Sequence, residues 1–299
     1  MPQDKLTIGV FDSGFGGLTV LRELLPLIPG AHYIYLGDTA RLPYGSKSHE
    51  TIARYAVSSA RYLHEQGADL LVIACNTATA LAFDDIRRAM PIPVIGVIQP
   101  GAEAALTAST TRAKNNAVIL SAAKNPRILL EAPTSNQSHT LVLATQATIQ
   151  SHAYAHALHA LGLEATEKAC PLLVPMVEEG WTNHPVTDEV LKIYLTEALA
   201  EAPNAQTLLL GCTHYPLIEP AIARVLAELG HPLTIIDSAH ATARTTAQAI
   251  DTHFPHRKPQ ETAATCTFYA TDSIEKFQRL GSNFLGQPLS KVHLLDLGG

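Results

Sequence analysis

Short apolar runs alternate with longer amphipathic stretches along most of this chain. Apolar runs of three to six residues are typical of buried strands, and apolar residues spaced three to four apart are typical of helices. Strands separated by helices form βαβ units, so the alternation predicts an α/β protein with mainly parallel sheets. The predicted strands cover residues 6–11, 33–36, 70–74, 94–97, 208–210 and 233–236, and residues 128–130 or 141–143 open the second series. The predicted helices cover residues 18–27, 49–66, 78–90, 152–161 and 221–229.

The composition fits a globular protein with two domains. The chain has 299 residues, of which 46% are hydrophobic and 16% charged, so it can bury a large core. Its net charge of −6 disfavours a nucleic-acid-binding role. Four cysteines without a C-x-x-C pair do not form a disulfide scaffold. The sequence shows no long apolar run and no secretory pattern at its start, so we expect no membrane association and a cytoplasmic location.

Two of the four cysteines occur in the same local context. Cys75 and Cys212 each follow an apolar run and a small residue, and each precedes two polar residues. In parallel α/β sheets, active sites lie beyond the carboxyl ends of the strands. A thiol that opens a helix at such an end has its thiolate favoured by the helix dipole. The repeated context, 137 residues apart, predicts a duplicated half-domain whose two thiols face each other across a cleft.

Other polar clusters follow other apolar runs. Asp12 and Ser13 lie in a glycine-rich segment, residues 11–17, that precedes a predicted helix. Such a segment can bind an anion, or the two side chains can simply cap the helix. The spacing matches neither the dinucleotide fingerprint nor the phosphate-binding loop. Residues 143–151 supply hydroxyl groups at a similar junction, and residues 36–45 form a rigid polar turn.

Several kinds of chemistry need a pair of thiols or a thiol with a histidine. Cys212 and His214 together suit a nucleophilic hydrolase, but that role leaves Cys75 unused. A redox pair would bond the two thiols to each other. Zinc would need more ligands, and the helix that carries His152, His156 and His159 fits a solvated face better. The remaining role is two-base proton transfer, in which one thiolate removes an α-proton and the other thiol returns one to the opposite face.

Six segments of the chain resemble the signature blocks of the glutamate racemase family. They are DSGFGGLTV, GDTARLPYG, ACNTAT, ACPLLVPMVEEG, GCTHYPLI and IDSA, and they occur in the family's order over nearly the whole chain. The resemblance implies two pseudo-symmetric α/β domains of the Asp/Glu racemase type, with the active site in the cleft between them. It also implies a cofactor-independent isomerase that interconverts L- and D-glutamate and supplies D-glutamate for peptidoglycan. No pyridoxal phosphate, metal or nucleotide is expected.

The resemblance also assigns roles to individual residues. It implies that Cys75 serves the D-enantiomer and Cys212 the L-enantiomer as proton donors and acceptors. Asp12 is expected to assist Cys75, and His214 or Glu178 to assist Cys212. The implied substrate-binding set comprises Asp12, Ser13, Pro43, Tyr44, Gly45, Asn76, Thr77, Thr148, Thr213 and His214.

The chain departs from the family pattern in a few places. About 25 extra residues, near positions 111–138, are expected to form a surface loop or a disordered insertion, with a hairpin or a lid as alternatives. Ala147 stands where the family usually has glycine. We expect residues 1–98 with 238–299 to form one domain and residues 99–237 the other, and the family resemblance implies a homodimer. An aspartate or hydantoin racemase of the same fold stays an alternative, because hydroxyl groups and Asn76 bind either dicarboxylate.

Overall fold

The protein is built on two parallel β-sheets. The computed structural model describes residues 5–122, 138–257 and 262–298. The first sheet has six strands in the order β10-β9-β2-β1-β3-β4, and the second has four in the order β6-β5-β7-β8. The strands are β1 (Thr7–Asp12), β2 (His32–Gly37), β3 (Leu70–Ile73), β4 (Val94–Gly96), β5 (His139–Ala144), β6 (Glu164–Ala169), β7 (Ala205–Gly211), β8 (Thr234–Asp237), β9 (Thr265–Ala270) and β10 (Val292–Leu294).

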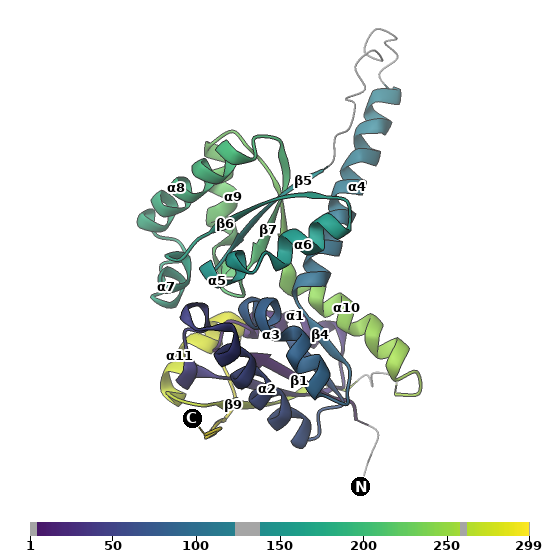
Figure 1. Ribbon diagram of the computed structural model, residues 1–299, viewed down its shortest axis with the longest axis vertical. Helices are drawn as coiled ribbons and strands as arrows, with labels where there is room; N and C mark the ends of the chain where they lie inside the picture. The colour runs from purple at the N-terminus through teal and green to yellow at the C-terminus, as the bar shows by residue number, and fades with distance from the viewer. Residues whose placement is uncertain (1–4, 123–137, 258–261, 299) are drawn as a thin grey trace.

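Helices cover both faces of each sheet, which explains why most strands are apolar throughout. In the first lobe, α1, α10 and α11 cover one face and α2 and α3 the other, with the second sheet forming a separate lobe (Figure 1). In the second lobe, α4 and α6 lie on one side and α8 and α9 on the other (Figure 1). The helices are α1 (Leu18–Leu27), α2 (His49–Glu65), α3 (Asn76–Ala89), α4 (Ile98–Ala122), α5 (Gln146–Gln150), α6 (Ala153–Ala160), α7 (Leu173–Glu178), α8 (Pro185–Glu201), α9 (Glu219–Glu228), α10 (Ser238–His253) and α11 (Ile274–Leu285). None of these helices is both long and apolar enough to cross a bilayer.

The two sheets repeat one strand order. The run β2-β1-β3-β4 of the first sheet corresponds to β6-β5-β7-β8 of the second, and all of these pairs are parallel. In this correspondence β3, which leads to Cys75, matches β7, which leads to Cys212. The predicted duplication is therefore present, and it places the two cysteines at equivalent strand ends.

One predicted loop is helical in part. We expected residues 111–138 to be a loop or a disordered insertion, but α4 continues to Ala122. The stretch up to that point contains no proline and no glycine after Gly101, so nothing in it interrupts helical hydrogen bonding. Residues 123–137 lie outside the described residues, and so does the candidate strand 128–130. The alternative start of the second series, residues 141–143, is confirmed as part of β5.

The elements missing from the prediction are mostly polar or C-terminal. Strand β6 has the sequence EATEKA and is half exposed, so it shows no apolar run. The sheets draw their strands from residues 7–96 with 265–294, and from residues 139–237. Helix α10 packs against both α1 and α4. The exact domain boundaries at residues 98 and 238 stay a prediction.

Candidate active site

Cys75 occupies the N-cap of α3, directly after β3. Its backbone is extended (φ −67°, ψ 119°), and its Sγ accepts the N–H of Ala78 at 3.4 Å. The side chain is almost completely buried, at 6% exposure. The predicted position of this thiol at a helix N-terminus is confirmed.

Cys212 follows β7 in the equivalent position but does not open an α-helix. A short 3₁₀ turn, Tyr215–Ile218, comes next, and α9 begins only at Glu219. Pro216 and Pro220 lie in this stretch and have no N–H to donate, which favours a short turn before the helix. The expectation of a helix N-terminus at this thiol was therefore wrong.

Both thiols line one cavity of about 390 Å³. Eleven of the predicted site residues line it: Ser13, Pro43, Tyr44, Gly45, Cys75, Asn76, Thr77, Glu178, Cys212, Thr213 and His214. Two others, Asp12 and Thr148, do not. Six further residues line it that the sequence analysis did not select: Leu42, Thr145, Val174, Pro175, Glu179 and Lys276. The fold thus brings segments from seven regions of the chain to one hollow.

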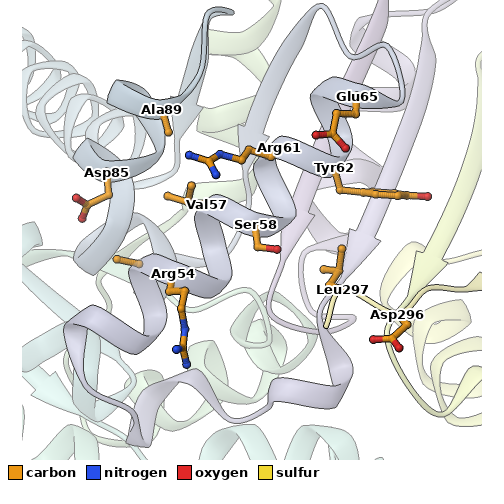
Figure 2. Close-up of a pocket in the computed structure, with 11 residues that line it drawn as sticks. Arg54, Val57, Ser58, Arg61, Tyr62, Glu65, Asp85, Ala89, Asp296 and Leu297 are labelled. Carbon is orange, nitrogen blue, oxygen red and sulfur yellow. The ribbon is translucent and has the colours of Figure 1, made fainter. Parts of the chain in front are cut away.

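A larger cavity, of about 670 Å³, lies elsewhere on the first lobe. Figure 2 shows its lining: Arg54 and Arg61 come from α2 and Asp85 from α3, and Asp296 and Leu297 lie at the other end. None of the predicted site residues lines it. Volume alone therefore does not identify the functional site.

Asp12 is buried behind Cys75. Its Oδ2 accepts the N–H of Gly14 at 2.9 Å, whereas its Oδ1 has no partner among the described residues. Burial raises the pKa of this carboxyl group above its ordinary value, although the hydrogen bond from Gly14 and the nearby His214 oppose the rise. The N-cap of α1 is Gly17, without a side-chain cap, so the helix-capping interpretation of Asp12 and Ser13 is wrong.

The surroundings of Cys75 favour the protonated form of its thiol. Its Sγ donates to the Ser13 Oγ at 3.4 Å. Burial and the neighbouring Asp12 raise the pKa of Cys75 to about 11. Burial raises the pKa of Cys212 as well, further than that of Cys75. Burial therefore favours the thiol form of both groups at neutral pH.

His214 links Cys212 to an acid. Its Nδ1 lies 3.9 Å from the Cys212 Sγ, and its Nε2 lies 3.3 Å from the Glu178 Oε1. Lys276 contacts the other carboxylate oxygen of Glu178 at 3.5 Å. Burial alone would raise the pKa of Glu178, but the hydrogen bond to His214 and the charges of His214 and Lys276 lower it below its ordinary value. Glu178 is therefore a carboxylate.

Three threonine hydroxyls tie the two halves together at the cavity wall. Thr77 Oγ1 lies 3.1 Å from Thr145 Oγ1 and 3.2 Å from Thr148 Oγ1, and the last two lie 3.0 Å apart. Thr145 lines the cavity, whereas Thr148 is completely buried behind it. The sequence analysis noted the hydroxyls of the ATQAT segment but selected only Thr148; the same signal could have identified Thr145.

A buried carboxyl group supports the loop that carries Tyr44. The Tyr44 hydroxyl donates to the Asp38 Oδ2 at 2.6 Å, and Thr271 donates to the Oδ1 at 3.0 Å. Arg41 forms an ion pair with the Asp38 Oδ2 at 3.6 Å. Asp38 is completely buried and does not line the cavity, so it acts on the site through Tyr44. The sequence analysis quoted its segment without assigning it a role.

Comparison with known proteins accounts for the duplication. The sequence model of the Asp/Glu/hydantoin racemase family matches residues 8–128 and, a second time, residues 127–246. The chain belongs to this family. Its members that resemble the chain over its full length include a glutamate racemase of Koribacter versatilis, 46% identical over 320 aligned residues, with all of both chains covered. A glutamate racemase of Geobacter metallireducens is 40% identical, with 97% of this chain and 96% of that protein covered.

Solved structures of the family agree with the fold. The crystal structure of the glutamate racemase from Francisella tularensis in complex with D-glutamate has a TM-score of 0.81 at 32% identity, with 98% of each chain covered. The structure from Thermus thermophilus in complex with β-chloro-D-alanine has a TM-score of 0.79 at 35% identity, also with 98% of each chain covered. The predicted racemase-type fold is confirmed.

Proposed function

We propose that the protein interconverts L- and D-glutamate by two-base proton transfer between Cys75 and Cys212. The observation that carries this proposal is the position of the two thiols, at equivalent strand ends of two matching sheets and on one cavity. Its full-length relatives are glutamate racemases. The protein is a glutamate racemase, an isomerase, and the family role of that activity is to supply D-glutamate for peptidoglycan.

The mechanism follows from the geometry of inversion. Cα of the substrate lies between the two sulfurs, so that one thiolate removes the α-proton and the opposite thiol returns a proton to the other face. Cys212 acts on L-glutamate and Cys75 on D-glutamate. A single base would return the proton to the face from which it came, so inversion needs both groups. The reaction removes one proton from Cα and returns one to it, and the two thiols can perform both steps.

The high thiol pKa values must be lowered when the substrate binds. The ammonium group on Cα brings a positive charge close to both sulfurs, and an opposite charge within ~4–6 Å favours the thiolate. His214, hydrogen-bonded to the carboxylate of Glu178, supports Cys212 from the other side. Asp12, whose charge acts on the Cys75 thiol, supports Cys75 as a proton acceptor or donor. These roles form part of the proposal.

The cavity lining suits two carboxylate groups. Hydroxyls of Ser13, Thr77 and Thr213, with the amide of Asn76, provide neutral donors on the wall. Of the described residues that line the cavity, Lys276 is the only lysine or arginine. Aspartate would meet the same donors, so the preference for glutamate follows from the relatives rather than from the donors. A homodimer and a cytoplasmic location remain our predictions.

Proton NMR of L-glutamate in D₂O tests the proposal. The purified protein, with reductant and chelator and without added cofactor, should remove the α-proton signal while a chiral assay detects D-glutamate. Cys75→Ser should then abolish inversion, whereas a hydrolase that used only Cys212 and His214 would keep most of its activity. Absence of exchange with glutamate, or exchange with aspartate alone, would contradict the assignment.

A further inference from the structure

Tyr154 connects the two cysteine-bearing junctions. It lies in α6 of the second lobe and is completely buried. Its hydroxyl donates to the Oδ1 of Asn76 at 2.6 Å, and Asn76 directly follows Cys75 in the first lobe. One side chain of the second lobe thus fixes the orientation of an amide beside the thiol of the first lobe.

The ring of Tyr154 also lies against the strand end that carries the other thiol. A Cβ atom at Gly211, the residue before Cys212, would lie 2.9 Å from Cε2 of Tyr154 and 3.0 Å from Cβ of Ala144. Real Cβ contacts do not come so close, so this ring position requires glycine at residue 211. Tyr154 is therefore in contact with the residue after one thiol and with the residue before the other.

Asn76 has a donor that is not used. Its Oδ1 is occupied by the Tyr154 hydroxyl, whereas its Nδ2 is buried and has no hydrogen-bond partner in the described part of the chain. Asn76 is 3% exposed and belongs to the wall of the cavity. A buried N–H without an acceptor is destabilising, so the site gains when an anion supplies one. Burial raises the pKa of Tyr154 well above its ordinary value, so its hydroxyl stays protonated and must donate.

We infer that Tyr154 is a positioning residue for substrate binding: its hydroxyl holds the Asn76 amide so that Nδ2 donates to a carboxylate of the bound substrate. Without that hydroxyl the amide can rotate by 180° and present its oxygen, which repels a carboxylate. Because the hydrogen bond joins the two lobes, the orientation of the Asn76 Nδ2 group is fixed only while the lobes are in contact. The inference rests on the proposed function for the identity of the anion.

A double-mutant cycle with Tyr154→Phe and Asn76→Ala tests this inference. Phenylalanine keeps the ring that packs at Gly211 and removes only the hydroxyl. We expect Tyr154→Phe to raise KM for L-glutamate about tenfold, with kcat lowered at most about threefold, because a donor to a charged group is lost. In the Asn76→Ala background the same change should alter KM by less than about twofold. Tyr33→Phe is the matched control, since Tyr33 is also completely buried and its hydroxyl donates to backbone oxygens of Leu24 and Ile28.

Two outcomes would overturn the inference. One is an unchanged KM in Tyr154→Phe while Asn76→Ala raises it. The other is a full additional effect of Tyr154→Phe in the Asn76→Ala background, because Tyr154 would then act by packing alone. The side-chain amide signal of Asn76 in ¹⁵N NMR, assigned by its loss in Asn76→Ala, gives a readout without turnover. It should shift in Tyr154→Phe and stay in place in Tyr33→Phe; an unshifted signal contradicts the inference even if the protein does not racemise glutamate.

Discussion

The Nδ1 atom of His214 lies 3.9 Å from the Sγ of Cys212. The imidazole packs against a pair of rings from the first lobe, with ring centroids 6.0 Å away at Phe15 and 4.9 Å away at Phe284. The residue that contacts the second thiol is therefore positioned by the lobe that carries the first thiol. This arrangement makes the chemistry at Cys212 sensitive to how the lobes are packed.

Substitution of His214 should slow both directions of the reaction equally but change their isotope effects differently. We expect His214→Asn to lower kcat/KM about 10²-fold, the usual contribution of a general acid–base group. The loss of kcat/KM must be equal in both directions, because the equilibrium constant of racemisation is one. The primary isotope effect should rise for α-deuterated L-glutamate and fall towards one for the D-enantiomer, since proton transfer at Cys212 becomes limiting. Equal isotope effects would contradict this role, and His240→Asn, on an exposed histidine outside the cavity, is the control.

The activity of the free enzyme should rise with pH. The pKa of Cys75 is about 11 and that of Cys212 is raised further, so the fraction of singly ionised protein grows about tenfold per pH unit below pH 10. We expect log kcat/KM to increase from pH 6 to pH 9. A profile that is level from pH 6 would show that a thiolate is already present in the empty site.

Stability should change in the opposite sense. The pKa of Cys75 is higher in the folded protein than the ~8.5 of a free thiol, so folding favours the protonated form. The stability that this preference contributes is fully present below pH ~8.5 and is lost as the pH rises towards 11. Urea unfolding at pH 7.5, 9 and 10 should show a decreasing free energy of unfolding, with a smaller decrease in Cys75→Ser.

Asp12 should cost stability at neutral pH. Burial raises the pKa of Asp12 in the folded protein, so folding favours its protonated form. The stability that this preference contributes is fully present below pH 3.8, the value for an unperturbed aspartate, and is lost as the pH rises through the folded pKa. We expect Asp12→Asn to raise Tm by about 2 °C or more at pH 7 while activity falls at least tenfold. Asp69→Asn is the control and should lower Tm, because the Asp69 carboxylate accepts the Thr7 N–H and pairs with Arg257. A lower Tm in Asp12→Asn would contradict this account.

Gly16 should be intolerant of a side chain. A Cβ at this residue would lie 2.3 Å from Oγ1 of Thr213 and 2.6 Å from Cε1 of His214. Gly16→Ala must displace these cavity-lining groups, and a displacement of ~1 Å at an active site costs up to about 10²-fold in rate. We expect a loss of tenfold or more in kcat/KM. Gly101→Ala, where the nearest atom is at 3.4 Å, should keep activity within about twofold.

Lys276 should make a smaller, salt-dependent contribution. It pairs with Glu178 across the two lobes but is half exposed, so solvent screens the pair. We expect Lys276→Met to lower kcat/KM about two- to fivefold at low salt and to have little effect at 1 M salt. Lys291→Met, on an exposed lysine outside the cavity, is the control. A loss that persists at high salt would contradict a screened electrostatic role.

The local patterns of the sequence predicted most apolar elements correctly. Residues 18–27 were predicted as a helix with the same bounds as α1, and residues 33–36 fall within β2. Strand β6 and the polar stretch up to Ala122 were missed, because neither carries the apolar periodicity of a buried element. Half-exposed strands, and helices whose sequence has no apolar stripe, leave a weak signal in one sequence.

The repeated cysteine context was sufficient to predict duplication and two-thiol chemistry. That context is local, since an apolar strand, a small residue and a thiol lie next to one another in the chain. The contacts that orient the site are not local: Tyr154 to Asn76 spans 78 residues, and Lys276 to Glu178 spans 98. A single sequence has no periodicity that couples such distant positions. The sequence by itself therefore determined the α/β alternation and the two thiols, whereas only the packing of the two lobes decided which side chains surround them.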